Sequence, residues 1–339
     1  MFLSLPGPND ILSFFTQAYF IPSPSWSLDK MPDMTDKVVI VTGGSAGLGK
    51  LTVKALLERN ATVYLAARDE KKSQNVIDEY TRLTGKVAIF LKMDLADLNS
   101  VRAAVEEFLS KENKLHVLYN NGGVMMPPTE KLTSQGYDLQ FGTNVLGHFY
   151  LTKLLLHTLL CTAEHTPEKI RVVNISSSAH YFLRRKFDLA SLKEGHVRRK
   201  WSTTDLYSQS KLGNILFANE LARRYGEKGI VSTSINPGNL KTDLNRHIRS
   251  CSFKSMALAL LQIYDANLGV LTQLWAGTSP EGANLSGKFL VPWCREGIPR
   301  PTADDPSLAK DLWKWMEEQV QKFEMSKLQC SPEIPGTTS

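Results

Sequence analysis

Residues 41–50, VTGGSAGLGK, contain four glycines within ten residues and directly follow the apolar run KVVI. In a strand–turn–helix unit, glycines in the turn let the backbone approach a pyrophosphate, whereas side chains would stand in the way. The N-terminus of the following helix adds amide donors and a favourable dipole. Because glycine-rich turns are common, this interpretation depends on the rest of the chain.

Short apolar runs alternate with amphipathic segments of helical length from Lys37 onward. Uniformly apolar strands separated by helices are typical of a parallel sheet that is covered on both faces. We therefore expect an α/β fold, a single doubly wound parallel sheet (Rossmann fold) of about seven strands with helices on both faces. The expected strands lie within residues 37–42, 62–67, 86–94, 115–120, 170–176, 230–236 and 287–290. The expected helices lie within residues 49–60, 70–82, 99–112, 135–160, 207–225, 257–275 and 306–323.

The chain of 339 residues, 42% of them hydrophobic, can bury a substantial core in one domain. Since nothing like a linker interrupts that core, we expect an N-terminal extension over residues 1–36, one Rossmann domain over 37–323 and a tail over 324–339. The net charge of +6 is too small to indicate nucleic acid binding. Four widely spaced cysteines match no metal or redox spacing. We therefore expect no metal site and a cytoplasmic protein with reduced thiols.

Two segments raise the question of a membrane, although the longest apolar stretches are shorter than the ~20 residues that a spanning helix needs. The N-terminal extension carries six aromatic residues without a basic leader, which fits a cleaved signal poorly. It either lies on a membrane, covers a pocket or packs on its own domain. The basic loop, residues 184–200, has seven basic and two acidic residues, and it faces a membrane, an anionic substrate or solvent. Peripheral contact with an intracellular membrane is thus one partner hypothesis.

The spacing of the glycine turn, T-G-x-x-x-G-x-G, resembles that of the short-chain dehydrogenase/reductase superfamily. The end of the second strand, VYLAARD, indicates which dinucleotide binds, because Ala67 stands where an acid usually accepts hydrogen bonds from the adenosine ribose. Arg68 follows it, and a guanidinium suits a ribose phosphate. We therefore predict NADP(H) as cofactor, with Arg68 as the phosphate clamp assisted by Ser45 and Lys72. The neighbouring Asp69 argues weakly in the other direction.

Other segments match elements that bind the cofactor in this superfamily. MDLAD matches the adenine-contact position, and YNNGGVM matches the N-N-A-G element except that Gly122 replaces alanine. NPGNLKT resembles the segment after the sixth strand, which turns beside the nicotinamide. The resemblance implies a cofactor site made of Gly43, Ser45, Gly47, Leu48, Gly49, Arg68, Asp94, Leu95, Asn120, Asn121, Gly123, Tyr207, Lys211, Pro237, Gly238 and Thr242.

Hydride transfer to a carbonyl needs a group that exchanges the hydroxyl proton. YSQSK provides Tyr207 and Lys211, an i, i+4 pair on one face of an expected helix. A neighbouring ammonium and an oxidised nicotinamide both favour the phenolate, and the lysine also holds the nicotinamide ribose. In VVNISSSAH the resemblance assigns Ser177 to the substrate oxygen, with Ser176 and Ser178 as alternative registers.

Asn144, in TNVLGHF, matches the asparagine that steadies the lysine through a water chain, and it completes the predicted catalytic set with Ser177, Tyr207 and Lys211. His148 and His180 lie near these motifs, but the mechanism needs neither of them. We therefore interpret both histidines as structural. Three C-terminal tryptophans are interpreted as packing residues rather than as a pocket lining or a dimer contact: Trp293, Trp313 and Trp315.

Longer segments narrow the resemblance, which covers residues 37–289. VYLAARD, LHVLYNNGGVMM and SKLGNILFANELARR look like the retinol dehydrogenase and WW-domain oxidoreductase branch, although no WW domain is present. The resemblance implies an NADP(H)-dependent oxidoreductase that interconverts an alcohol and its aldehyde or ketone. Its expected substrate is small and apolar, retinoid-like, isoprenoid, steroid or polyketide-derived, with secondary metabolism as one context and a homodimer as one partner hypothesis. A non-catalytic NADP(H) sensor or scaffold, and an epimerase or enoyl reductase of the same fold, are the alternatives.

Overall fold

The computed structural model describes residues 8–240 and 264–329. Thr242, one of the predicted cofactor residues, lies outside the described residues. The same holds for residues 257–263, the first part of one predicted helix.

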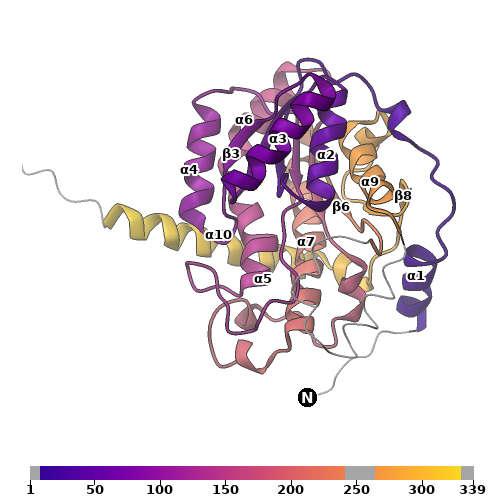
Figure 1. Ribbon diagram of the computed structural model, residues 1–339. Helices are drawn as coiled ribbons and strands as arrows, with labels where there is room; N and C mark the ends of the chain where they lie inside the picture. Colours follow the sequence, from indigo (N-terminus) through magenta and orange to yellow (C-terminus); the bar gives the residue numbers. More distant parts are fainter. Residues whose placement is uncertain (1–7, 241–263, 330–339) are drawn as a thin grey trace, which may run out of the picture.

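A single eight-stranded sheet forms the centre of the described structure, in the order β3-β2-β1-β4-β5-β6-β7-β8 (Figure 1). The strands β1 to β7 pair in parallel, and only the two-residue β8 is antiparallel. The predicted doubly wound α/β fold is confirmed. The chain winds outward in both directions from β1 and β4, and sheets of this kind bind ligands beyond the carboxyl ends of such strands. The strands are β1 (Val38–Thr42), β2 (Thr62–Ala67), β3 (Ile89–Lys92), β4 (Val117–Asn120), β5 (Ile170–Ile175), β6 (Ile230–Ile235), β7 (Phe289–Val291) and β8 (Arg295–Glu296).

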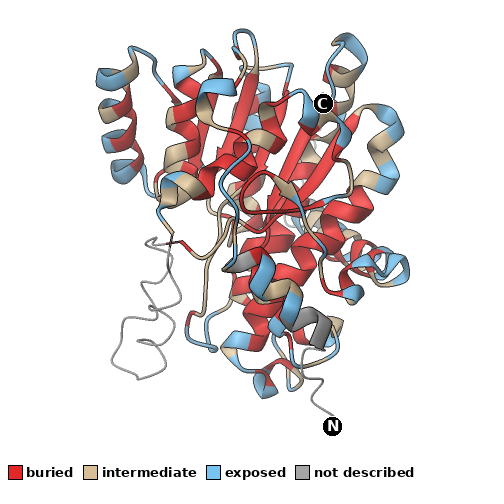
Figure 2. Ribbon diagram, turned by 90° about the vertical axis from the view of Figure 1, so that its right-hand side faces the viewer, coloured by how far each residue is buried: buried red, intermediate tan, exposed pale blue. Residues whose placement is uncertain are grey.

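Helices cover both faces of the sheet, and each face has its own apolar core. Val38 and Ile40 of β1 belong to one core, whereas the alternate residues Val39 and Val41 belong to the other. The strands are therefore apolar along their whole length, and Figure 2 shows them buried. The first face carries α4 (Leu98–Leu109), α6 (Gly147–His165), α7 (Thr203–Tyr225) and α10 (Pro306–Gln329). The second carries α2 (Gly47–Glu58), α3 (Glu70–Thr84) and α9 (Ala266–Thr278).

Three helix boundaries differ from the prediction, and a capping residue explains the first of them. The helix predicted from residue 135 begins at Leu139, because the Asp138 carboxylate accepts hydrogen bonds from the backbone N–H groups of Gln140 and Phe141, at 3.0 and 2.9 Å. The helix predicted over residues 257–275 begins, within the described chain, only at Ala266. At the other end of the chain, α10 continues past the predicted end at residue 323 to Gln329.

The helical segment Leu139–His165 consists of α5 (Leu139–Phe141), a π-helical turn (Gly142–Leu146) and α6. It is long and apolar enough to cross a membrane by length and composition, which the sequence analysis did not anticipate. However, 67% of its most apolar window is buried inside the protein, where it packs between the sheet and α4. Its apolar character is that of a core helix.

The N-terminal extension packs on its own domain. Its helix α1 (Pro8–Ala18) lies beside a short 3₁₀ helix, η3 (Ser178–Phe182), at one edge of the molecule (Figure 1). Farther along, Trp26, Met31 and Met34 are buried in the core that contains α2 and α9. Of the three alternatives for this segment, packing on its own domain is therefore observed in the described part.

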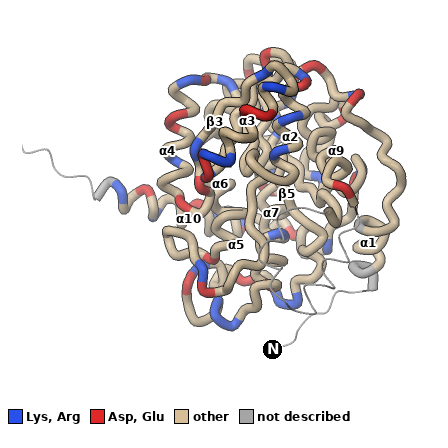
Figure 3. The backbone as a smooth tube through the Cα atoms, viewed as in Figure 1, with Lys and Arg blue, Asp and Glu red and all other residues tan. Residues whose placement is uncertain are grey.

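The basic loop uses several of its charges inside the protein. Arg198 and Asp138 form an ion pair of 2.9 Å with only 3% and 2% of their side chains exposed. Arg184 pairs with the buried Asp205 at 2.8 Å. Figure 3 shows basic and acidic residues interspersed over the molecule rather than gathered on one basic face. Trp313 and Trp293 are buried and Trp315 is partly buried, as expected for packing residues.

Candidate active site

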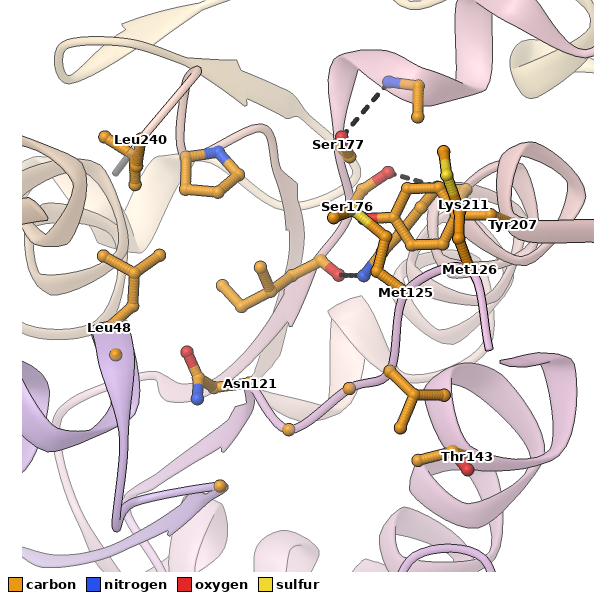
Figure 4. Close-up of a pocket in the computed structure, with 18 of the residues that line it drawn as sticks. Leu48, Asn121, Met125, Met126, Thr143, Ser176, Ser177, Tyr207, Lys211 and Leu240 are labelled. Carbon is orange, nitrogen blue, oxygen red and sulfur yellow. Dashed lines mark hydrogen bonds between the residues drawn. The ribbon is translucent and has the colours of Figure 1, made fainter. Parts of the chain in front are cut away.

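A cleft of about 1260 Å³ lies at the carboxyl ends of the strands. It is larger than the ~300–1,000 Å³ typical of a site for one ligand, so it has room for a dinucleotide and a second molecule. Figure 4 shows Leu48 and Asn121, beside the glycine turn, across from Tyr207 and Lys211. Most of the predicted cofactor residues, together with Tyr207 and Lys211, thus line one cavity.

The glycine turn packs backbone against backbone. A Cβ at Gly49 would lie 2.4 Å from the carbonyl oxygen of Gly43 and 2.6 Å from Nδ2 of Asn121. A Cβ at Gly43, whose φ is +66°, would lie 2.8 Å from the Cα of Gly122. Gly47 has φ +51° with open space around it, so its backbone faces the cleft. This cradle fits a pyrophosphate, with Gly49 behind it as a packing residue.

Gly122, where the superfamily has alanine, allows an additional close approach. A Cβ there would lie 2.8 Å from Cδ1 of Leu95 and 3.3 Å from the backbone nitrogen of Gly43. The missing methyl group therefore lets Leu95 pack closer to the glycine turn.

Thr42 joins the glycine turn to the loop after β4, a role that the sequence had not indicated. Its hydroxyl accepts hydrogen bonds from the backbone N–H groups of Asn121 and Gly122, at 2.9 and 2.8 Å. The network assigns the tautomer of His148, since its Nδ1 donates to the Asn144 carbonyl at 3.0 Å. Its Nε2 then accepts from the Thr42 hydroxyl at 2.8 Å. His148 thus lies behind the cleft as a structural residue, as expected.

Burial lowers the pKa of His148 to about 4 and that of His180 to about 3. Between pH 6.5 and 4.5 the unfolded chain therefore binds more protons than the folded one, so stability falls as the pH falls. We expect each histidine to contribute roughly 3 kcal/mol to the decrease in the free energy of unfolding by pH 4.5. Urea denaturation between pH 7.5 and 4.5 measures it.

The matched variants are His148→Gln and His180→Gln, each of which should flatten this pH dependence, with the exposed His165→Gln as control. A free energy of unfolding that stays level down to pH 4.5, or equal slopes for all three variants, would contradict the assignment.

Tyr207 and Lys211 lie one turn apart on α7, and both are almost completely buried, with 4% and 6% exposed. The Ser202 hydroxyl caps this helix by accepting from the backbone N–H of Asp205 at 3.1 Å. The Lys211 ammonium donates to the carbonyl of Ile175, at the end of β5, at 2.8 Å. It lies 5.8 Å from the centre of the Tyr207 ring. The strand end thus fixes the lysine beside the phenol.

The electrostatics of this pair differ from the prediction. Burial raises the pKa of Tyr207 to about 12, against a smaller lowering by its hydrogen bond with Ser177. Burial also lowers the pKa of Lys211 to about 7. The expected acidification of the phenol by the ammonium is therefore not seen in the polypeptide itself, because both groups are withdrawn from water. At neutral pH Tyr207 is a protonated phenol, a form that can donate a proton.

The three consecutive serines after β5 have different partners. The Ser176 hydroxyl is buried and donates to the backbone carbonyl of Lys211 at 2.7 Å. Ser177 accepts from the backbone N–H of Ala179 at 3.1 Å and contacts the phenol of Tyr207. The geometry therefore favours Ser177 over the alternatives Ser176 and Ser178 as the partner of a substrate oxygen.

Asn144 lies in the π-helical turn and does not itself line the cleft. Its Oδ1 accepts from the backbone N–H of Val124 at 2.8 Å, and its Nδ2 donates to the Val124 carbonyl and to Ser210 Oγ, both at 3.0 Å. A Cβ at Gly123 would lie 3.0 Å from Asn144 Oδ1 and 4.0 Å from Lys211 Nζ. Asn144 thus positions the loop next to the lysine, and its water relay stays a prediction.

Asn120 is an exception among the predicted cofactor residues. It is 1% exposed, and its Nδ2 donates to Asn174 Oδ1 at 2.9 Å and Thr152 Oγ1 at 3.3 Å. Because side chains alternate along a strand, Asn121 points toward the glycine turn and Asn120 toward α6 on the opposite face of the sheet. The predicted cofactor contact of Asn120 is therefore wrong. The predicted residues that do line the cleft are Gly43, Ser45, Gly47, Leu48, Arg68, Asp94, Leu95, Asn121, Gly123, Tyr207, Lys211, Pro237 and Gly238.

Arg68 and Lys72 line the cleft where β2 ends. The carboxylate of Asp69 caps α3 by accepting a hydrogen bond from the backbone N–H of Lys72 at 2.9 Å. This capping role accounts for an acid at position 69 without a hydrogen bond to a ribose. Within the residues that the structure describes, neither basic side chain forms an ion pair. Both are therefore available to an anion.

The apolar end of the cleft was largely missed by sequence reasoning, because no local motif marks it. It combines the N-terminal extension with loops after β4, β5 and β6. In the sequence, only the aromatic composition of the N-terminal extension pointed to this apolar end of the cleft. The additional lining residues include Phe14, Phe15, Tyr19, Met125, Met126, Thr143, Phe182, Arg184, Thr204, Ser208 and Leu240.

The fold and the cleft define a nicotinamide-dinucleotide oxidoreductase of the Rossmann class. A family model described as short chain dehydrogenase matches residues 37–185. A short-chain dehydrogenase/reductase of Armillaria gallica is 53% identical over 304 residues, which cover 90% of this chain and 96% of the relative. The chain belongs to the short-chain dehydrogenase/reductase family.

Two further comparisons agree with this membership. Retinol dehydrogenase 11 of Homo sapiens is 44% identical over 62% of this chain and 63% of its own, in agreement with the resemblance to the retinol dehydrogenase branch. The fold is shared with the RhlG/NADP active-site complex of Pseudomonas aeruginosa, with a TM-score of 0.60 and 21% identity over 77% of this chain and 96% of that one.

Proposed function

We propose that this protein is an NADP(H)-dependent oxidoreductase that interconverts an alcohol and its aldehyde or ketone on an apolar substrate. The observation that carries the proposal is the convergence of Ser177, Tyr207 and Lys211 at the apolar end of a cleft whose other end is the glycine turn. The proposal also includes a cytoplasmic location, a context in secondary metabolism and a homodimer.

When bound, the nicotinamide dinucleotide supplies the hydride for reduction or accepts it for oxidation. Tyr207 donates its phenolic proton to the oxygen of the carbonyl as negative charge develops there. Ser177 donates a hydrogen bond to the same oxygen and fixes its position. Because burial keeps the Tyr207 phenol protonated, this group can supply the proton that reduction of a carbonyl needs.

Lys211 has two parts in this proposal. The Ile175 carbonyl holds its amino group next to Tyr207 and beside the cleft, where it can hold the ribose of the cofactor. Burial brings its pKa to about 7, so its charge responds readily to an added anion or cation in the cleft.

Three side chains support NADP(H) over NAD(H). Arg68 offers a bidentate guanidinium for a ribose phosphate, with Lys72 and Ser45 in the same part of the cleft.

Arg68→Glu tests the cofactor preference. We expect the Kd of NADPH to rise about 100-fold, since the variant loses a charge-assisted contact and adds repulsion, whereas the Kd of NADH changes little. Fluorescence titration with both cofactors measures these constants. The control is Lys114→Glu, an exposed charge reversal before β4, at the amino ends of the strands and so on the side opposite the cleft. Equal wild-type affinity for NADH and NADPH would refute the preference.

A further inference from the structure

The N-terminal helix α1 and the residue that follows its end contribute to the same cleft as the proton-transfer residues. The ring of Phe14 lies edge-on to that of Phe182 in η3, with centroids 4.6 Å apart. The Tyr19 ring lies 5.4 Å from Phe14 and 5.7 Å from Phe15. We call these four residues the aromatic wall: Phe14, Phe15, Tyr19 and Phe182.

Gln17 attaches this wall to the body of the domain. It is 8% exposed, and its Nε2 donates to the Tyr181 hydroxyl at 3.2 Å and to the Ile298 carbonyl at 3.3 Å. Its Oε1 accepts from the backbone N–H of Ile298 at 3.0 Å. A Cβ at Gly297 would lie 2.4 Å from that oxygen, so glycine is needed for the approach. The segment after β8 is thus shaped to receive Gln17.

A second attachment lies two residues farther along the chain, at Tyr19. The Tyr264 hydroxyl donates to the backbone carbonyl of Tyr19 at 2.7 Å. The Tyr264 ring packs edge-on to buried Trp293, with centroids 5.3 Å apart. The C-terminal end of the helix is therefore held twice, at Gln17 and at Tyr19, by groups that are themselves fixed in the domain.

The wall is also linked to the catalytic serine. Ser177 caps η3 through its hydrogen bond with Ala179, and Phe182 is the last residue of η3. His180, between them, bonds the Ser177 carbonyl through its Nδ1 at 2.6 Å. Phe14 therefore packs against η3. The first turn of η3 is capped by Ser177, the residue that we propose to contact the substrate oxygen.

We propose that α1 forms the outer wall of the substrate site and sets its preference for long apolar substrates, with Gln17 as the residue that positions the wall. Residues 11–20, ILSFFTQAYF, contain no charged side chain, so the wall offers aromatic surface to the distal part of a ligand. This inference rests on the proposed function for the reaction itself, but it concerns binding and can be measured without turnover.

The test uses the full chain saturated with NADPH, which cannot accept a hydride from an alcohol, and calorimetric titration with 1-decanol and 1-butanol as probes. We expect Phe14→Ala and Gln17→Leu each to weaken 1-decanol binding about tenfold, which corresponds to exposing one or two methylene groups of the ligand to water. Binding of the shorter 1-butanol should weaken less than twofold in both variants. Leu12→Ala is the matched control, since Leu12 lies on the same helix with 64% of its side chain exposed. Binding of NADPH should be the same in all variants.

Hydrogen exchange in the full chain separates the two roles. Exchange of the backbone amides in residues 12–20 should speed up in Gln17→Leu more than in Phe14→Ala, because only the former loses the attachment. Unchanged 1-decanol affinity in both variants, or a wild type that binds 1-decanol no better than 1-butanol, would overturn the proposal that α1 forms the outer wall of the substrate site. Tight 1-decanol binding without any turnover of decanal would instead contradict the proposed reaction and leave the wall supported.

Discussion

Tyr207→Phe should lower kcat for aldehyde reduction about 1,000-fold, because it removes the only proton donor that we place at the substrate oxygen and changes little else. General acid catalysis by a positioned side chain contributes ~10²–10⁴-fold. Phenylalanine conserves the ring in a site that is 4% exposed, so packing and folding should be preserved. Steady-state oxidation of NADPH with decanal measures kcat, and fluorescence titration measures the Kd of NADPH, which should change less than twofold.

The same helix offers a matched control for this prediction. Tyr225→Phe removes a phenolic hydroxyl at the end of α7, far from the cleft-lining residues of that helix, and should keep the wild-type kcat. A Tyr207→Phe enzyme within tenfold of the wild type would mean that another group transfers the proton.

The second large effect is expected at Gly49, where the change affects binding rather than chemistry. Alanine would place its Cβ 2.4 Å from the Gly43 carbonyl oxygen and 2.6 Å from Asn121 Nδ2, closer than real contacts permit. The helix α2 then has to move away from the glycine turn, which distorts the cradle on which the pyrophosphate would lie. We expect the Kd of NADPH to rise at least ~100-fold, a loss of about 3 kcal/mol. Isothermal titration of purified protein with NADPH measures it.

Gly195→Ala is the control for Gly49→Ala, because a Cβ at Gly195 meets nothing within 4 Å. It should leave both the Kd and the thermal midpoint unchanged. If Gly49→Ala bound NADPH as tightly as this control, the close packing of the turn would not be a requirement for the cofactor.

Local patterns in the sequence were sufficient to predict most of the fold. Parallel strands buried on both faces leave uniformly apolar runs, and the seven predicted strands all exist. The errors lie at element ends, where a single side chain decides. Asp138 starts the helix at Leu139 through two backbone hydrogen bonds, and this cap was not recognised in SQGYDLQ. The two-residue β8 is too short to produce any periodic signal.

The candidate site was predictable where a motif encodes backbone geometry, and less so where tertiary contacts decide. The glycine turn and the Tyr207–Lys211 spacing follow from local rules, because turn and helix fix their own neighbours. The predicted cofactor contact of Asn120 failed because strand alternation directs its side chain toward α6, away from the cleft. The pKa of Tyr207 depends on burial by distant segments, and no spacing rule reports such burial. The contact of Phe14 with Phe182 joins residues 168 positions apart, which no local pattern contains.

The account depends most on hydride transfer at the cleft with Tyr207 as the proton donor. Decanal and NADPH deuterated at the transferring C4 position, incubated with wild type and with Tyr207→Phe, test this directly by mass spectrometry of the alcohol. We predict 1-decanol with one deuterium from the wild type and about 1,000-fold less from the variant in the same time, at equal NADPH occupancy. Unlabelled alcohol from the wild type, or equal labelled yields from both proteins, would contradict the account.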